Sequence, residues 1–515
     1  MRLLLWSTLA GVLAAGTAFG ALAAEPVKGG AINVATIGEP PTLDPSASTA
    51  DIVGLIAQHY YETLYTFGQD WKIVPLLAAE APTISQDGTQ YVIGLREGVK
   101  FHDGSTMDAD DVVASLKRWM DVAVRGKQAA AYVTEVTAVD PLTVRIVLSE
   151  PYAPLMGLLS LATSAAIVMP ADKAAAGTAE QAGDPVGTGP YRFQERQPDR
   201  YILLTRFEDY TAREDAADLY GGRRTAHLDE IRFVPVPNAN TRVEGALGGQ
   251  YHYADALPVE AYGTLDGQPG VEPAVVEPFG WPVMFFNTRE GALTDPALRR
   301  AVLASLNFSD MLEAAFGSGE FYAVDGSLYP EGFIWHTEAG TAAHDQGDPA
   351  KAAEMAQAAG YDGKPIRILT SMQYEFHYKM ALVAAEYMKQ AGFQVDLQVS
   401  DWATLTQRRG EPGLWEIYFT HSPFLPEPAL NSFLNNEAPG WWATPEKDAL
   451  VAALNTQSDP AARAAIWADF QELVYEQVPI AKVGNFNALG ARSTRLAGFQ
   501  PSPWPFFWNT WIESD

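Results

Sequence analysis

Alternating apolar and polar positions in the first half of the chain predict short β-strands. Residues 31–38 (AINVATIG) alternate in this way and end at a glycine, and residues 201–207 (YILLTRF) follow a turn rich in glycine and proline. Side chains on a strand point to two faces in turn, so a period of two is typical of a strand with one buried face. This half of the chain therefore predicts a mixed, strand-rich region.

The apolar period changes to that of α-helices in the second half. In DPALRRAVLASL, Asp295 is placed to cap a helix, Pro296 occupies its first position, and apolar side chains recur on one face. Residues 348–360 (DPAKAAEMAQAAG) repeat the same device and end at a glycine. Both segments predict helices.

A strand–helix–strand unit follows these helices. Residues 366–370 (IRILT) and 393–399 (FQVDLQV) have strand patterns, and a helical pattern over about 378–391 separates them and stops at Gly392. Such units are expected to be parallel and right-handed. The second half therefore predicts an α/β region.

The N-terminus has the pattern of a signal peptide over residues 1–24. Arg2 supplies the positive charge, residues 3–15 are apolar, and Ala21-Leu22-Ala23 matches the small-residue pattern of a cleavage site. The alternative is a single N-terminal anchor helix. No later stretch has about twenty uninterrupted apolar residues, so the sequence predicts an exported protein with no membrane span.

Composition limits the function classes. A chain of 515 residues is expected to form two or three domains. The net charge of −28 disfavours nucleic acid and anionic membrane surfaces as partners. The chain has no cysteine, which excludes thiolate zinc sites, cysteine nucleophiles, iron–sulfur clusters and the lipid-modified cysteine of lipoproteins. We therefore expect a protein without a lipid anchor.

The stretch FHDGSTMDADDVV combines a histidine with several carboxylates and could hold a metal or an acid–base centre. Asp108, however, is placed to cap a helix, with Asp110 and Asp111 in its positive first turn. His102 and Asp103 are neighbours on a strand pattern and so point to opposite faces. The acidic run is therefore interpreted as a helix start.

No catalytic signature is present in the sequence. HExxH, GxSxG, SxxK, the P-loop and a complete GxGxxG are all missing. We expect no catalytic residues, no metal site and no cofactor, although a site assembled across the fold stays open at this point.

Residues 75–119 (PLLAAEAPTISQDGTQYVIGLREGVKFHDGSTMDADDVVASLKRW) resemble the signature region of the family 5 solute-binding proteins of dipeptide, oligopeptide and nickel ABC importers. Further stretches agree with the family in order: PPTLDP at 40–45, PVGTGPYRF at 185–193, FFNTREGALTDPALRRAVLASL at 285–306 and DPAKAAEMAQAAGYDG at 348–363. The similarity spans nearly the whole mature chain.

This resemblance implies an α/β, two-lobed periplasmic-binding-protein fold of the type II-like cluster C class. A ligand would be buried between hinged lobes and delivered to an ABC permease and ATPase complex at the inner membrane, by a periplasmic, monomeric protein that is not an enzyme. The implied domains are lobe I from 25–58, 186–282 and 484–515, an inserted subdomain of that lobe at 59–185, and lobe II at 283–483.

Two positions depart from the dipeptide-binding relatives. In those relatives an aspartate before an Asp-Pro turn holds the peptide ammonium; here Glu427-Pro428 stands for the turn and the ammonium position falls near Phe424. The arginine that meets the peptide carboxylate should fall within residues 369–376 (LTSMQYEF), which contain none. The sequence therefore predicts that free dipeptides are poor ligands.

A peptide-like or other small polar organic ligand is expected, held by aromatic and polar side chains near the implied cleft. The candidates are Trp281, Gln373, Tyr374, His377, His421 and Phe424. His377 and His421, with the resemblance, leave a nickel or other metal chelate as an alternative ligand. Two other functions also stay open: a secreted hydrolase with a dispersed site, and a sensory or chaperone-like accessory that binds cargo without delivering it.

Overall fold

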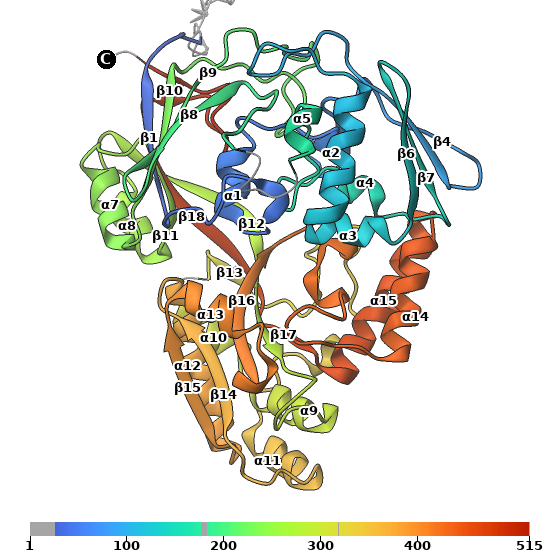
Figure 1. Cartoon of the computed structure of the whole chain (residues 1–515). Helices are drawn as coiled ribbons and strands as arrows, with labels where there is room; N and C mark the ends of the chain where they lie inside the picture. Colours follow the sequence, from blue (N-terminus) through green and yellow to red (C-terminus); the bar gives the residue numbers. More distant parts are fainter. Residues whose placement is uncertain (1–25, 177–182, 318, 514–515) are drawn as a thin grey trace, which may run out of the picture.

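The structure is a computed structural model that describes residues 26–176, 183–317 and 319–513. The predicted signal peptide lies outside these residues. Two lobes lie one above the other in Figure 1 and are joined by strands in the middle of the molecule. Within the described ranges, no helix combines the length and apolar character needed to cross a bilayer.

A twelve-stranded sheet runs through both lobes, in the order β15-β14-β16-β12-β18-β11-β1-β10-β9-β8, with β13 and β17 paired at its side. The upper lobe contributes β1 (Ala31–Thr36), β8 (Tyr191–Gln197), β9 (Tyr201–Arg206), β10 (Glu230–Pro235) and β11 (Tyr253–Leu257). The lower lobe contributes β13 (Tyr322–Ala323), β14 (Ile366–Ser371), β15 (Val395–Ser400), β16 (Ile417–Pro423) and β17 (Ile480–Lys482).

The long strand β12 (Val271–Phe286) and its partner β18 (Asn485–Ser493) connect the lobes (Figure 1). The first part of β12 pairs with β18, the register shifts between Val276 and Gly280, and the last part pairs with β16 and β17. The predicted lobe boundary at 282/283 falls inside β12, and the one at 483/484 falls between β17 and β18. The lobe ranges themselves stay a prediction.

A separate four-stranded sheet stands beside the upper lobe, in the order β4-β5-β7-β6. Its strands are β4 (Thr83–Ile84), β5 (Gln90–Gly94), β6 (Val133–Asp140) and β7 (Thr143–Leu148), and it packs with α2 (Ala109–Val122) and α3 (Val124–Ala130) around a core of its own. This arrangement lies within the segment that the sequence predicts as an inserted subdomain.

The acidic run before α2 is a helix start, as predicted. The Asp108 carboxylate accepts hydrogen bonds from the backbone N–H groups of Asp110 and Asp111, at 2.9 and 3.3 Å. The Asp111 carboxylate accepts from the Asp108 N–H at 3.1 Å, which completes a capping box.

His102 is also part of the architecture. One ring nitrogen lies 3.0 Å from the Gly189 carbonyl and the other accepts from the Gly187 N–H at 3.3 Å. A Cβ atom on Gly187 would come within 2.0 Å of the Tyr60 carbonyl, and one on Gly189 within 2.4 Å of the His59 carbonyl. These glycines let two backbone segments pass in contact.

The lower lobe carries the three predicted helices, α9 (Pro296–Ser305), α11 (Pro349–Ala358) and α12 (Glu375–Gln390). It also carries α10 (Phe308–Phe316), α14 (Pro445–Thr456) and α15 (Pro460–Gln477), which the sequence patterns did not predict. Asp295 and Asp348 cap α9 and α11, and β14 and β15 are parallel, as predicted. The helix predicted from about residue 378 starts earlier, at Glu375, because its first turn is held by tertiary packing of Phe376 against Phe316 and Phe486.

Candidate functional site

A cavity of about 430 Å³ lies between the two lobes. The upper lobe lines it with the start of α1 (Asp51–Ala57), the start of α7 (Ala239–Leu247), β11 and the turn η2 (Val259–Ala261). The lower lobe lines it with the end of α10, residues 372–376 and the first turns of α12. This volume is within the range of pockets for small organic molecules.

Aromatic rings from both lobes form much of the wall. Phe486 on β18 stacks on Phe316 with 5.3 Å between ring centroids and lies 5.2 Å from Phe376. The Tyr374 ring meets the edge of His421 at 4.8 Å. These rings offer apolar faces on which a ligand could pack.

The upper-lobe side of the cavity carries two carboxylates. Asp51, the first residue of α1, accepts a hydrogen bond from the Trp504 indole N–H at 2.8 Å, and burial raises its pKa. Burial also raises the pKa of Asp255, on β11, to about 6, against the opposing charge of Arg242. Both side chains are part-buried, and both line the cavity.

Arg242 lines the same side, but backbone carbonyls occupy its guanidinium. Its Nε donates to Asp255, one Nη to Val236 and Pro237, and the other Nη to Ala256, over 2.7 to 3.2 Å. Burial lowers its pKa. The arginine therefore holds the loops around the cavity together.

The other cation of the lining is Lys379 on α12. It forms a salt bridge with Glu260 on η2 and a second with Glu375, one helical turn away, at 3.4 Å. Glu260 and Glu375 are exposed and Lys379 is half-buried. This cluster links the two lobes at a solvent-accessible side of the cavity.

Three of the six residues predicted from the sequence line the cavity: Gln373, Tyr374 and His421. The Gln373 side-chain oxygen accepts from the Trp402 N–H at 2.6 Å. His377 lies behind His421, with 3.1 Å between its Nε2 and the His421 Nδ1. Burial lowers the pKa of His421 to about 4 and that of His377 well below its usual range, so both rings are neutral at pH 7.

Trp281 and Phe424, the remaining two, belong to a packed core of the lower lobe and are not among the residues that line the cavity. Trp281 packs at a right angle to Phe433 with 6.1 Å between centroids. Phe424 lies 6.0 Å from Phe333, and the Lys482 ammonium is 5.8 Å from its ring.

Two charged side chains, Glu427 and Arg367, lie close in sequence to the positions where the charges of dipeptide-binding relatives are missing. Both are paired within the protein. Glu427 forms a buried bidentate pair with Arg463, at 2.7 and 3.0 Å. Arg367, on β14 before the segment that lacks an arginine, pairs with Glu416 at 2.7 and 2.9 Å. Neither arginine lines the cavity.

Sequence reasoning missed Asp51, Arg242 and Asp255. Asp51 reads as an ordinary acid in the first turn of a helix. Asp255 had a weak signal, since a lone carboxylate in the strand YADAL is unusual in a largely buried segment. No local motif connects these positions.

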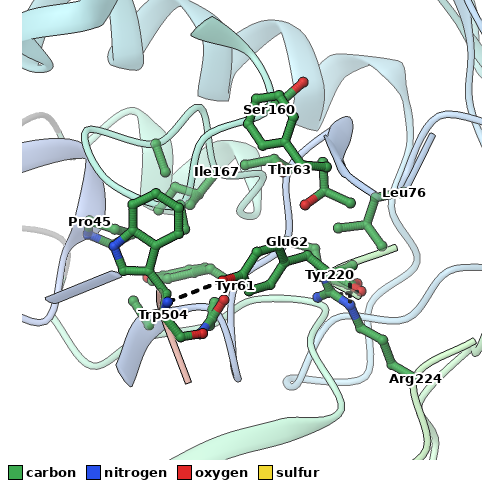
Figure 2. Close-up of a pocket in the computed structure, with 16 residues that line it drawn as sticks. Pro45, Tyr61, Glu62, Thr63, Leu76, Ser160, Ile167, Tyr220, Arg224 and Trp504 are labelled. Carbon is green, nitrogen blue, oxygen red and sulfur yellow. Dashed lines mark hydrogen bonds and ion pairs between the residues drawn. The ribbon is translucent and has the colours of Figure 1, made fainter. Parts of the chain in front are cut away.

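A second, much smaller cavity of about 30 Å³ lies inside the upper lobe (Figure 2). Glu62 and Arg224 form a buried ion pair there at 3.4 Å, and the Thr188 and Tyr210 hydroxyls donate to Glu62. Figure 2 shows the Trp504 backbone N–H donating to the Tyr220 hydroxyl beside this pair. The space suits one or two water molecules, so we assign this cluster a structural role.

A model of the bacterial extracellular solute-binding proteins, family 5, matches residues 72–441. The chain belongs to this family. A probable peptide ABC transporter periplasmic-binding protein of Sinorhizobium fredii is 25% identical over 483 residues, which cover 90% of each chain. The glutathione-binding protein GsiB of Salmonella paratyphi A is 25% identical and covers 97% of this chain and 96% of its own.

Solved structures of other binding proteins share the fold. AgaA from A. tumefaciens, in complex with agropinic acid, has a TM-score of 0.82 and 23% identity, over 94% of this chain and 99% of its own. NikA from Brucella suis, in complex with Fe(III)-EDTA, has a TM-score of 0.76 and 21% identity, over 92% and 97%. The predicted α/β, two-lobed fold is confirmed.

Proposed function

We propose that this family 5 protein is the solute-binding component of an ABC importer and captures a peptide-like or other small polar organic ligand between its lobes. The observation that carries the proposal is the cavity of about 430 Å³, walled by both lobes and lined by aromatic and polar side chains. Ligand contacts with both lobes would favour a closed state over an open one.

The proposal includes the ligand contacts. Gln373, Tyr374 and His421 line the cavity and would face the ligand. His377 would orient the His421 ring through the contact between their nitrogens. Trp281 and Phe424 would support the lower lobe rather than touch the ligand, because other side chains cover them.

Delivery to a permease and ATPase at the inner membrane follows the role named for the relatives as ABC-transporter periplasmic-binding proteins. The N-terminal signal pattern and the absence of cysteine support a periplasmic protein without a lipid anchor. We expect a monomer with no enzymatic activity.

The hydrolase alternative needs a nucleophile held by a general base. Ser502 is the one serine that lines the cavity within the described ranges, and its hydroxyl donates to the Trp504 carbonyl at 3.2 Å. This bond to the backbone favours a structural role for Ser502. The binding function therefore has the better support.

The metal-chelate alternative depends on His377 and His421. Their nitrogens face each other, and the part of the chain that the structure describes contains no group of three or more His, Asp or Glu residues arranged for a metal ion. The organic ligand remains the first candidate.

Native mass spectrometry of protein purified from a periplasmic extract tests the proposal. A co-purified small molecule that is released on unfolding, and that reduces the radius of gyration in solution scattering when added back, would support it. Turnover of that molecule, or its binding without any change in scattering, would contradict it.

A further inference from the structure

The carboxylates and the cations on the cavity wall differ in how far other residues pair with them. One carboxylate oxygen of Asp51 accepts a hydrogen bond from the Trp504 indole N–H, while the other accepts none from any residue that the structure describes. The Asp255 carboxylate accepts hydrogen bonds from the Ala256 N–H and from the Tyr253 hydroxyl on its own strand. Neither carboxylate forms a salt bridge with any residue that the structure describes, although both line the cavity. The charge of Arg125 acts on Asp51, and that of Arg242 acts on Asp255, without a direct ion pair. The upper lobe therefore presents two carboxylates to a ligand.

The cations of the wall are already engaged. Four backbone carbonyls surround the Arg242 guanidinium, and two carboxylates pair with the Lys379 ammonium. A ligand anion would have to break these contacts in order to be paired. A ligand cation would meet available oxygens.

Tyr374 places the lower lobe opposite these carboxylates. All three side chains line the same cavity. Burial raises the pKa of the Tyr374 hydroxyl, and the charges of Asp51 and Asp255 raise it further. Burial raises the pKa of Asp255 as well, because it disfavours the charged form more than Arg242 and the hydrogen bonds favour it. A cation bound there would relieve that cost.

Building on the proposed function, we propose that the ligand carries a positively charged group, a protonated amine or a guanidinium, which binds to Asp51 and Asp255. Its less polar part packs against Tyr374 and Phe486, and cation–ring contacts with aromatic faces add to the attraction. The same cavity disfavours ligands whose recognition requires a free carboxylate.

A charge series built on one dipeptide tests this inference. The probes are Ala-Phe amide, which is a cation, N-acetyl-Ala-Phe amide, which is neutral, N-acetyl-Ala-Phe, which is an anion, and free Ala-Phe, which is a zwitterion. Calorimetry and solution scattering on the full mature chain at pH 7 should rank the amide first. We expect it to bind at least about tenfold more tightly than the neutral or anionic probe, which is the effect of one charge-assisted hydrogen bond.

Two variants locate the charge. Asp51→Asn keeps an oxygen for the Trp504 indole N–H, and Asp255→Asn keeps the size of the side chain. Each should weaken the amide about 10- to 150-fold without affecting the weak binding of the neutral probe. Asp266→Asn, at an exposed position outside the cavity in the same lobe, is the matched control and should not change either affinity.

The outcomes separate this inference from the proposed function. Neutral or anionic probes that bind as tightly as the amide, with compaction, would overturn the charge inference and leave solute binding in place. Equal affinity of the amide for the wild type and Asp255→Asn would do the same. If none of the four probes binds or compacts the wild-type protein, both statements are overturned for ligands of this size.

Discussion

Lys379 on α12 forms a salt bridge with Glu260 on the opposite side of the cavity. Glu260 belongs to the η2 turn beside β11, in the upper lobe, and α12 belongs to the lower lobe. The pair therefore connects the lobes directly, next to the space where a ligand would bind.

Removing this pair should favour the open state. We expect Lys379→Met to weaken binding of a cavity ligand such as Ala-Phe amide about two- to fivefold, because a partly exposed salt bridge contributes little and is screened by solvent. Solution scattering should show a larger radius of gyration for the liganded variant than for the liganded wild type.

Lys389→Met is the matched control for this change. Lys389 lies on the same helix and pairs with Glu386 at 2.7 Å, away from the cavity. The Lys389→Met variant should bind Ala-Phe amide with the affinity of the wild type and show the same radius of gyration with ligand. An equal effect of both variants would show that helix stability, and not the contact between lobes, is responsible.

Asp255 should reduce the stability of the ligand-free protein. Its pKa is raised to about 6 from 3.8, so the folded state binds its proton more tightly than the unfolded state, and this group favours folding more as the pH falls from 6 toward 4. At pH 7 the ionised form carries a cost, and Asp255→Asn should raise the free energy of unfolding by about 1–3 kcal/mol.

Denaturant unfolding of the two proteins at pH 7 and pH 5 measures this difference. The advantage of the variant should shrink at pH 5, where protonation already relieves the wild type. A variant that is less stable than the wild type at pH 7 would show that the Asp255 charge supports the fold through Arg242.

The buried histidines should make the protein sensitive to acid. Burial lowers the pKa of His59 to about 3 and that of His102, His344 and His421 to about 4. Because the pKa is lower in the folded state, the unfolded state takes up the proton first as the pH falls. The contribution of each neutral ring to stability is therefore fully present above pH 6.5 and is lost as the pH falls toward 4. Each of these histidines should lower the free energy of unfolding at pH 5 by about 1–2 kcal/mol relative to its value at pH 7.5.

Urea unfolding at pH 7.5 and pH 5.0 measures the combined loss of stability from these histidines. Asp255 stabilises the folded state at the lower pH, but this offsets the loss only in part. His59→Gln should reduce the difference between the two pH values, since this ring accepts from the Phe507 N–H and lies 3.2 Å from the Ile56 carbonyl. Equal stability at both pH values would contradict the prediction.

The Glu427–Arg463 pair should affect the stability of the fold and not the recognition of a charged ligand. Both side chains are nearly buried, and removing one partner leaves an uncompensated charge. We expect Glu427→Ala to lower the free energy of unfolding by about 3–5 kcal/mol. The double change Glu427→Leu with Arg463→Leu should cost less than this, because no charge is left unpaired. A larger loss in the double variant would contradict that account.

Local structural features could be predicted from the sequence. The capping box at Asp108, the Asp-Pro starts of α9 and α11, and the parallel pair β14–β15 all depend on residues close together in the chain. The start of α12 was placed too late, since Phe376 is held by side chains from other elements.

The sequence by itself determined the family, the α/β class and the structural role of the acidic run, because order of motifs, periodicity and capping are properties of neighbouring residues. Only the tertiary structure decided the composition of the cavity wall. Asp51 and Asp255 come from a helix and a strand far apart in the chain, and Tyr374 faces them from the other lobe. Which side chains share one enclosed space depends on how those segments pack, and no local pattern records it.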